Sequence, residues 1–218
     1  MRITILVIAS SDLGIYAEHE RCWRSYATSD PGITVYFLRQ REDIEAPLIE
    51  GDTLWTPGEE RLERVFDKTV AAFRFLDPTS YDYLVRTNLS SVWHFPNLLR
   101  SCSYLPPTRV FCGVLGTPGL SGAGMILSPD VVTTLADNSG RVERGMWDDI
   151  DFGKVAELCG IPRTRGYRFD PKSRFDVDRW WTSGYHFYLK DMQGGVRNVA
   201  NELDVMRYLI HKIYQTPL

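Results

Sequence analysis

The sequence predicts an α/β fold, a three-layer sandwich in which helices cover a mostly parallel central sheet. A largely apolar run, Ile3 to Ala9, in which Thr4 is the one polar residue, is typical of a central strand that is covered on both faces. Stretches with strand and helix patterns then alternate along the chain, as they do in α/β proteins. The length of 218 residues, with 44% hydrophobic and 24% charged residues, is enough for one globular domain with a substantial core.

The first third of the chain reads as strand, helix, strand and helix. We expect a helix over 15–27 and a second strand over 33–38, which with the first strand forms a right-handed crossover unit. Residues 40–58 are charged and are predicted to be irregular. Apolar residues then recur at helical spacing from Leu62 to Leu76, which predicts an amphipathic helix.

The middle of the chain continues the alternation. A strand is expected to begin at Tyr83, a helix to cover 95–101 and a further strand to cover 109–115. Residues 116–124 hold four glycines and a proline, so they are predicted to form a loop. A short strand follows at 125–127, and two helices follow that strand.

The C-terminal part is harder to assign. Residues 162–184 have weak periodicity, and 184–190 form either a short strand or a loop. A closing helix is predicted over 198–214 from its apolar face. We therefore expect a C-terminal helical segment, 191–218, that packs on the domain formed by the residues before it.

Composition excludes some functions. A formal net charge of −3, from 25 basic and 28 acidic residues, gives no reason to expect nucleic-acid binding. The four cysteines are scattered without metal-type spacing, which is typical of free thiols in a reducing compartment, so we expect a cytoplasmic protein. No apolar stretch approaches the roughly 20 residues that a membrane span requires.

A candidate ligand site follows the strand that begins at Tyr83. In open α/β sheets, ligands bind beyond the carboxyl ends of the strands, and this strand runs into polar residues. Arg86 offers a fork of donors for phosphate or carboxylate, and Asn88 and Ser90 offer an amide and a hydroxyl. Ser90 or Ser91 could instead cap the following helix, but a cap does not account for Arg86 and Asn88.

Two other places have polar side chains suited to a site. Ser10 and Ser11 follow the first strand, where they could bind a nucleotide base or ribose, or simply form a turn and helix cap. Asp148 and Asp149 precede an apolar helix. Such a pair can raise one pKa and provide a general base. Alternatively, the acids only stabilise a helix N-terminus, by about 0.3–1 kcal/mol.

Three segments, taken in chain order, resemble those of a known protein family. Tyr83 to Trp93 joins a hydrophobic strand to a polar run, Leu120 to Ser128 reads Leu-Ser-Gly-Ala-Gly-Met-Ile-Leu-Ser, and Asp148 to Gly153 reads Asp-Asp-Ile-Asp-Phe-Gly. Together they resemble the inverting glycosyltransferases of the fringe and β-1,3-galactosyltransferase type, which have the Rossmann-like GT-A fold. A weaker fourth match, Gly184 to Leu189, is similar to the family segment whose histidine ligates the metal.

The resemblance covers residues 1–190 and implies that they form a nucleotide-sugar-dependent glycosyltransferase domain. It also implies a nucleotide-sugar donor, with UDP as its nucleotide, and a glycan or sugar acceptor. It implies that Asp149, in preference to Asp148, is the base that takes the acceptor proton. The implied donor-binding residues are Ser10, Ser11, Arg86, Thr87, Asn88 and Ser90. The implied sugar or acceptor pocket consists of Gly122, Ala123, Gly124 and Trp147.

One departure from the family pattern bears on the metal. The family's Asp-x-Asp motif, which binds Mn²⁺, is replaced here by Asn88, Leu89 and Ser90, and an amide oxygen without carboxylate charge binds a hard cation less well. Three hypotheses follow. Arg86, with Arg165 or Arg168, neutralises the diphosphate without metal; His186 and Asn88 hold Mn²⁺ or Mg²⁺; or the chain is a weak or inactive module that binds nucleotide or glycan. The retained aspartate pair favours an enzyme.

Overall fold

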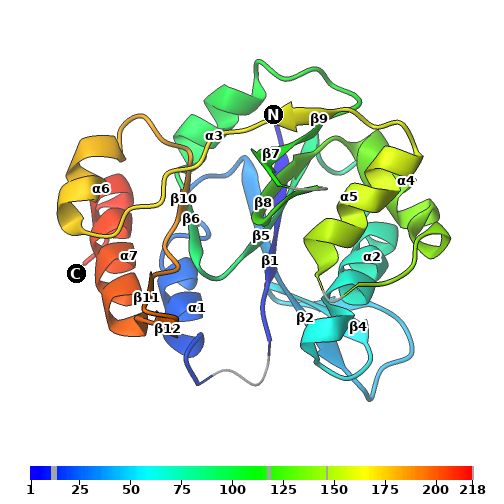
Figure 1. The fold of residues 1–218 in the computed structure, drawn as a ribbon, viewed down its shortest axis with the longest axis horizontal. Coiled ribbons are helices and arrows are strands. Elements are labelled where there is room, and N and C mark those ends of the chain that lie inside the picture. Colours follow the sequence, from blue (N-terminus) through cyan, green and yellow to red (C-terminus); the bar gives the residue numbers. More distant parts are fainter. Residues whose placement is uncertain (11–13, 117–118, 146, 218) are drawn as a thin grey trace.

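A large central sheet forms the middle of the computed structural model, which describes residues 1–10, 14–116, 119–145 and 147–217 (Figure 1). Its strands lie in the order β3-β4-β2-β1-β5-β8-β7-β9. They are β1 (Ile3–Ile8), β2 (Ile33–Arg41), β3 (Leu48–Glu50), β4 (Thr53–Pro57), β5 (Tyr83–Asn88), β7 (Phe111–Leu115), β8 (Leu120–Leu127) and β9 (Arg163–Arg165).

The register of the sheet brings the ends of several strands to one edge. Strand β1 pairs in parallel with both β2 and β5, so that Ile8 lies opposite Leu38 on one side and Asn88 on the other. Strand β4 extends this parallel set beyond β2, and β8 runs antiparallel between β5 and β7. The carboxyl ends of β1 and β5 therefore meet the beginning of β8.

Helices cover both faces of the sheet, which confirms the predicted three-layer sandwich (Figure 1). One face carries α1 (Ala17–Arg24), α3 (Phe95–Cys102), α6 (Arg174–Trp180) and α7 (Val199–Tyr214). The other face carries α2 (Val65–Phe75), α4 (Pro129–Asp137) and α5 (Asp148–Leu158). Within the described residues, no helix has both the length and the apolar content needed to cross a bilayer.

Alternation along β1 explains why every residue of this strand except Thr4 is apolar. Ile3, Ile5 and Val7 pack into the core beneath α1 and α7, whereas Leu6 packs into the core beneath α2 and α5. Successive side chains of a strand point to opposite faces, so a strand covered on both sides has apolar residues on both of its faces.

The C-terminal residues pack onto the face that carries α1. Helix α7 contacts α1, α6 and β6 (Ser91–Trp93), which pairs with β10 (His186–Tyr188). The Tyr214 hydroxyl donates to the Trp93 carbonyl oxygen at 2.5 Å and accepts from the Phe95 backbone N–H at 3.0 Å. A short hairpin, β11 (Met192–Gln193) and β12 (Val196–Arg197), precedes this helix.

Two local predictions were wrong, and one of the alternatives is excluded. Residues 40–58 are not irregular: β2 extends to Arg41, and β3 and β4 form a hairpin that turns at Gly51 with a φ of 62° and buries Leu54. The predicted loop 116–124 also contains the first half of β8. Helix α3 is capped by His94, whose Nδ1 accepts from the Asn97 N–H at 3.3 Å, and not by a serine.

Position 124 in β8 must be a glycine because two aromatic rings lie against its backbone. A Cβ there would be 2.5 Å from Cε1 of His186 and 2.6 Å from Cζ2 of Trp93, both in buried rings that are stacked on each other. We expect Gly124→Ala to lower the free energy of unfolding by about 1–3 kcal/mol, the usual cost of overpacking. Gly140→Ala is the control because a Cβ at Gly140 has no atom within 4 Å. Equal urea midpoints for the two variants would contradict this prediction.

Candidate active site

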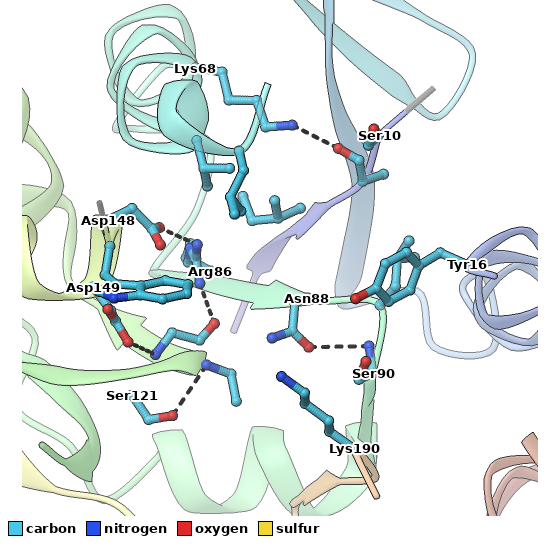
Figure 2. Close-up of a pocket in the computed structure, with 18 of the residues that line it drawn as sticks. Ser10, Tyr16, Lys68, Arg86, Asn88, Ser90, Ser121, Asp148, Asp149 and Lys190 are labelled. Atoms are coloured by element: carbon cyan, nitrogen blue, oxygen red, sulfur yellow. Dashed lines mark hydrogen bonds and ion pairs between the residues drawn. The ribbon is translucent and has the colours of Figure 1, made fainter. Parts of the chain in front are cut away.

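A cavity of about 570 Å³ lies at the edge of the sheet where β1, β5 and β8 meet (Figure 2). Its walls come from the ends of β1 and β5, the beginning of β8, the first turns of α2 and α5, and the chain around Lys190. Ligands of open α/β sheets bind at this edge, and a concave pocket with a few convergent polar groups is the usual form of an active site.

Most of the residues predicted for the site are in the walls of this cavity. Those that line it are Ser10, Arg86, Asn88, Ser90, Gly122, Ala123, Trp147, Asp148 and Asp149. Ser11 lies outside the described residues. Thr87 is buried under the cavity floor, where its hydroxyl donates to the Ala123 carbonyl oxygen at 2.7 Å and accepts from Trp93 Nε1 at 3.0 Å. Gly124 also lies outside the cavity lining, where the rings of His186 and Trp93 lie against its backbone.

His186 lies behind the cavity wall. Its ring is stacked on the indole of Trp93, with centroids 4.1 Å apart and planes 6° from parallel, and its Nε2 is 3.4 Å from Ser91 Oγ. Burial lowers the pKa of His186 well below its usual range, so the imidazole is neutral at pH 7. In this position the ring packs against Trp93 and does not face the cavity.

Asp148 and Arg86 form a mostly buried ion pair at the first turn of α5. One guanidinium nitrogen of Arg86 donates to Asp148 Oδ2 and another donates to the Gly122 carbonyl oxygen (Figure 2). Burial raises the pKa of Asp148, although the positive charge of Arg86 opposes this shift. The pair joins α5 to β5 and β8, and the charge of Arg86 is balanced within the protein.

Asp149 is held in a different way. Its Oδ2 accepts from the Gly122 N–H at 2.9 Å, and its Oδ1 accepts from the Ile150 N–H at 2.9 Å. Within the described part of the chain, Asp149 forms no ion pair. Gly122 allows this approach because a Cβ there would be 3.0 Å from an Arg86 nitrogen and 3.3 Å from Asp149 Oδ2. The site therefore contains one carboxylate paired with a cation and one held by backbone amides.

Lys68 also lines the cavity, although it was not among the predicted site residues. Its side chain is 1% exposed, and its ammonium group donates to the Ala9 carbonyl oxygen at 2.7 Å and to Glu60 Oε1 at 2.5 Å. Burial lowers the pKa of Lys68, and the Glu60 carboxylate opposes this shift. The signal was the position of Lys68 three residues after Val65, on the apolar side of α2, where a solvated lysine is not expected. Tyr16, Ser121, Tyr188 and Lys190 also line the cavity and were missed.

The two arginines expected near a diphosphate do not line the cavity. Arg168 pairs with Asp170 at 2.7 Å and donates to Ser121 Oγ at 3.0 Å, behind the wall, and Arg165 is exposed. Apart from Arg86 and Lys68, the basic residues that line the cavity in the described chain are Arg61 and Lys190.

The residues that replace the Asp-x-Asp motif, Asn88 to Ser90, are not arranged to bind a divalent cation. Asn88 Oδ1 accepts from the Ser90 N–H at 3.1 Å and from Ser91 Oγ at 3.3 Å, so the amide oxygen is used within the chain and the amide nitrogen faces the cavity (Figure 2). Hard cations bind oxygen ligands. Among the described residues, no group of three or more His, Cys, Asp or Glu is placed to hold a metal ion.

Comparison with known proteins supports the fold. No family model matches the sequence, and no curated protein matches it. A solved glycosyltransferase from Streptococcus pneumoniae, GlyE, superposes with a TM-score of 0.51 at 10% identity, over 96% of this chain and 60% of that one. The chain has a GT-A fold. The likeness to fringe-type enzymes in particular stays a prediction.

Two other solved glycosyltransferase structures superpose on the chain with lower TM-scores. The catalytic domain of Drosophila β1,4-galactosyltransferase 7, in complex with xylobiose, superposes with a TM-score of 0.45 at 16% identity, over 75% of this chain and 64% of that one. A mutant of the same enzyme, in complex with manganese, UDP-Gal and xylobiose, gives a TM-score of 0.44 with the same identity and coverage. The chain spans less than two thirds of the length of each of these solved chains.

Proposed function

We propose that the chain is a glycosyltransferase, which moves a sugar from a nucleotide donor to a hydroxyl group of a glycan or sugar acceptor. The observation that carries this proposal is the arrangement of the cavity. At the sheet edge of a GT-A fold, amide and hydroxyl groups of Asn88 and Ser90 line one part, and the carboxylates of Asp148 and Asp149 line another. Figure 2 has these two groups on separate sides of the same space.

Transfer with inversion needs a base that takes the proton of the acceptor hydroxyl. Asp149 suits this role because its carboxylate is fixed by backbone amides and is not neutralised by a cation in the described chain. Asp148, which is in the first turn of α5, pairs with Arg86 of β5 and so fixes that turn, and Asp149 with it, against the sheet. The indole of Trp147, 52% exposed, offers an apolar surface next to both acids for an acceptor sugar.

The departing nucleoside diphosphate needs positive charge or hydrogen-bond donors near its oxygens. Arg86 and Lys68 are each balanced by a carboxylate, whereas Lys190 forms no ion pair in the described chain (Figure 2). The amide nitrogen of Asn88 lies in the same wall. We therefore assign the diphosphate to Lys190 and Asn88, with UDP as the nucleotide.

The test is donor turnover with and without chelation. We expect the purified protein to hydrolyse or transfer from at least one UDP-sugar at the same rate in EDTA and in Mn²⁺, because the residues at the Asp-x-Asp position do not fit a cation. Turnover that is lost in EDTA and restored by Mn²⁺ would contradict the metal-independent part of the proposal. Nucleotide binding without turnover from any donor would favour an inactive binding module instead.

A further inference from the structure

Arg197, in the C-terminal segment, holds two residues of the cavity wall without lining the cavity itself. Its guanidinium lies 4.6 Å over the ring of Tyr16 and donates to the Tyr16 hydroxyl oxygen. A second nitrogen donates to Ser90 Oγ at 2.7 Å. Tyr16 and Ser90 both line the cavity and come from distant parts of the chain. One side chain therefore fixes both hydroxyl groups.

Glu202 fixes the orientation of Arg197. Two guanidinium nitrogens of Arg197 donate to the two carboxylate oxygens of Glu202 at 2.8 and 2.6 Å, and Glu202 is fully buried. His19 Nε2 lies 3.2 Å from the same carboxylate, and the Asp191 N–H donates to it at 2.8 Å. Although burial opposes it, these hydrogen bonds lower the pKa of Glu202 to about 2. The arginine is thus held by a charged partner at every ordinary pH.

This arrangement determines which way the hydroxyl protons point. An arginine donates hydrogen bonds and accepts none, and a hydroxyl group has one proton. Because the oxygens of Tyr16 and Ser90 each accept from Arg197, each hydroxyl keeps its proton for an acceptor on the cavity side. Asn88 presents its amide nitrogen to the same space because its oxygen accepts from Ser90 and Ser91.

We propose that Arg197 is a positioning residue that leaves the hydroxyl protons of Tyr16 and Ser90 free to donate into the cavity, where these two hydroxyls and the Asn88 amide form a wall of hydrogen-bond donors for the oxygen acceptors of a nucleotide. This inference rests on the proposed function, which supplies the nucleotide. A donor wall recognises carbonyl and phosphate oxygens directly. The wall would bind the nucleotide through its hydroxyl and amide protons, at the position where the fringe-type enzymes that the sequence resembles have a metal-binding motif.

The wall is tested by calorimetric titration with UDP and GDP in EDTA. We expect Tyr16→Phe and Ser90→Ala each to weaken nucleotide binding about 2- to 10-fold, as the loss of one hydrogen bond does. Arg197→Lys keeps the charge, but its three tetrahedral N–H donors cannot replace the four hydrogen bonds that the planar guanidinium makes to Tyr16, Ser90 and Glu202. We expect it to weaken binding about as much as the two wall substitutions combined, and Tyr16→Phe to add little in that background.

Kinetics separate positioning from a general loss of structure. The wall contacts the nucleotide before and during transfer, so the variants should raise the KM for the sugar donor and leave kcat unchanged. Arg174→Lys is the matched control because Arg174 also lies over a tyrosine, Tyr208, at 5.1 Å and pairs with a carboxylate, Asp204, but at the surface away from the cavity. It should leave nucleotide binding unchanged.

The outcomes distinguish this inference from the proposed function. Wild-type binding of UDP or GDP together with unchanged binding by Tyr16→Phe and Ser90→Ala would overturn the donor wall alone. These two substitutions remove only a hydroxyl group, so they report on the wall even if Arg197→Lys fails to fold. A wild-type protein that binds neither nucleotide would overturn both the proposed function and the wall.

Discussion

Replacing Asp149 with Asn is expected to lower sugar transfer by about 10²- to 10⁴-fold, the contribution typical of a positioned general base. The amide cannot take the proton of the acceptor hydroxyl. Its carbonyl oxygen can still accept from the Gly122 N–H, which is 2.9 Å from the carboxylate oxygen it replaces. The amide nitrogen cannot accept from the Ile150 N–H as Asp149 Oδ1 does, which costs about 1 kcal/mol of stability, so the variant should still fold and bind nucleotide. The measurement is the transfer rate at saturating donor, beside the dissociation constant for the nucleotide.

Asp130→Asn is the matched control for this variant. Asp130 is also in the first turn of a helix, α4, and also accepts a backbone N–H from another segment, that of Arg109, at 2.9 Å. It lies outside the cavity lining, so its substitution should leave transfer unchanged. Full transfer by Asp149→Asn would remove Asp149 from the base role. A parallel loss of nucleotide binding would instead make it a residue that shapes the site.

The location of the site could be predicted because it depends on local patterns. Two apolar runs that each end in polar residues are parallel strands, and their ends must meet at one edge of the sheet. The period of two also decides which residues of β5 face the cavity: Arg86 and Asn88 share one side, and Thr87 between them points away. Applying this alternation to the sequence would have removed Thr87 from the predicted site.

The missing parts of the site depend on contacts between distant segments. Arg197 reaches Ser90 across 107 positions, and no local pattern marks either residue as the partner of the other. The same is true of Gly124, whose glycine reads as a turn signal but is required by the rings of His186 and Trp93. A glycine needed for close packing and a glycine needed for a turn look alike in one sequence. This ambiguity accounts for the shortened prediction of β8, whereas the expected ligand role of His186 came from the resemblance of Gly184 to Leu189 to a family segment.

Replacing Arg86 with Met is expected to lower the free energy of unfolding by about 3–5 kcal/mol at pH 7, because it leaves the mostly buried carboxylate of Asp148 without its cation. Burial already raises the pKa of Asp148, and the loss of Arg86 raises it further. A carboxyl group whose folded pKa is raised costs no stability below its unfolded pKa, and the cost grows as pH rises through the folded pKa. The difference between variant and wild type should therefore shrink as pH falls.

Urea unfolding across acidic and neutral pH measures this effect, and two variants separate its causes. Adding Asp148→Asn to Arg86→Met removes the unpaired charge and should recover much of the stability at pH 7. Arg174→Met breaks an ion pair whose side chains are 55% and 48% exposed, so it should lower the stability far less than Arg86→Met does. If the loss in Arg86→Met is the same at every pH and is not recovered by the second substitution, then the stabilisation comes from the packing of Arg86 and its hydrogen bond to Gly122, not from Asp148.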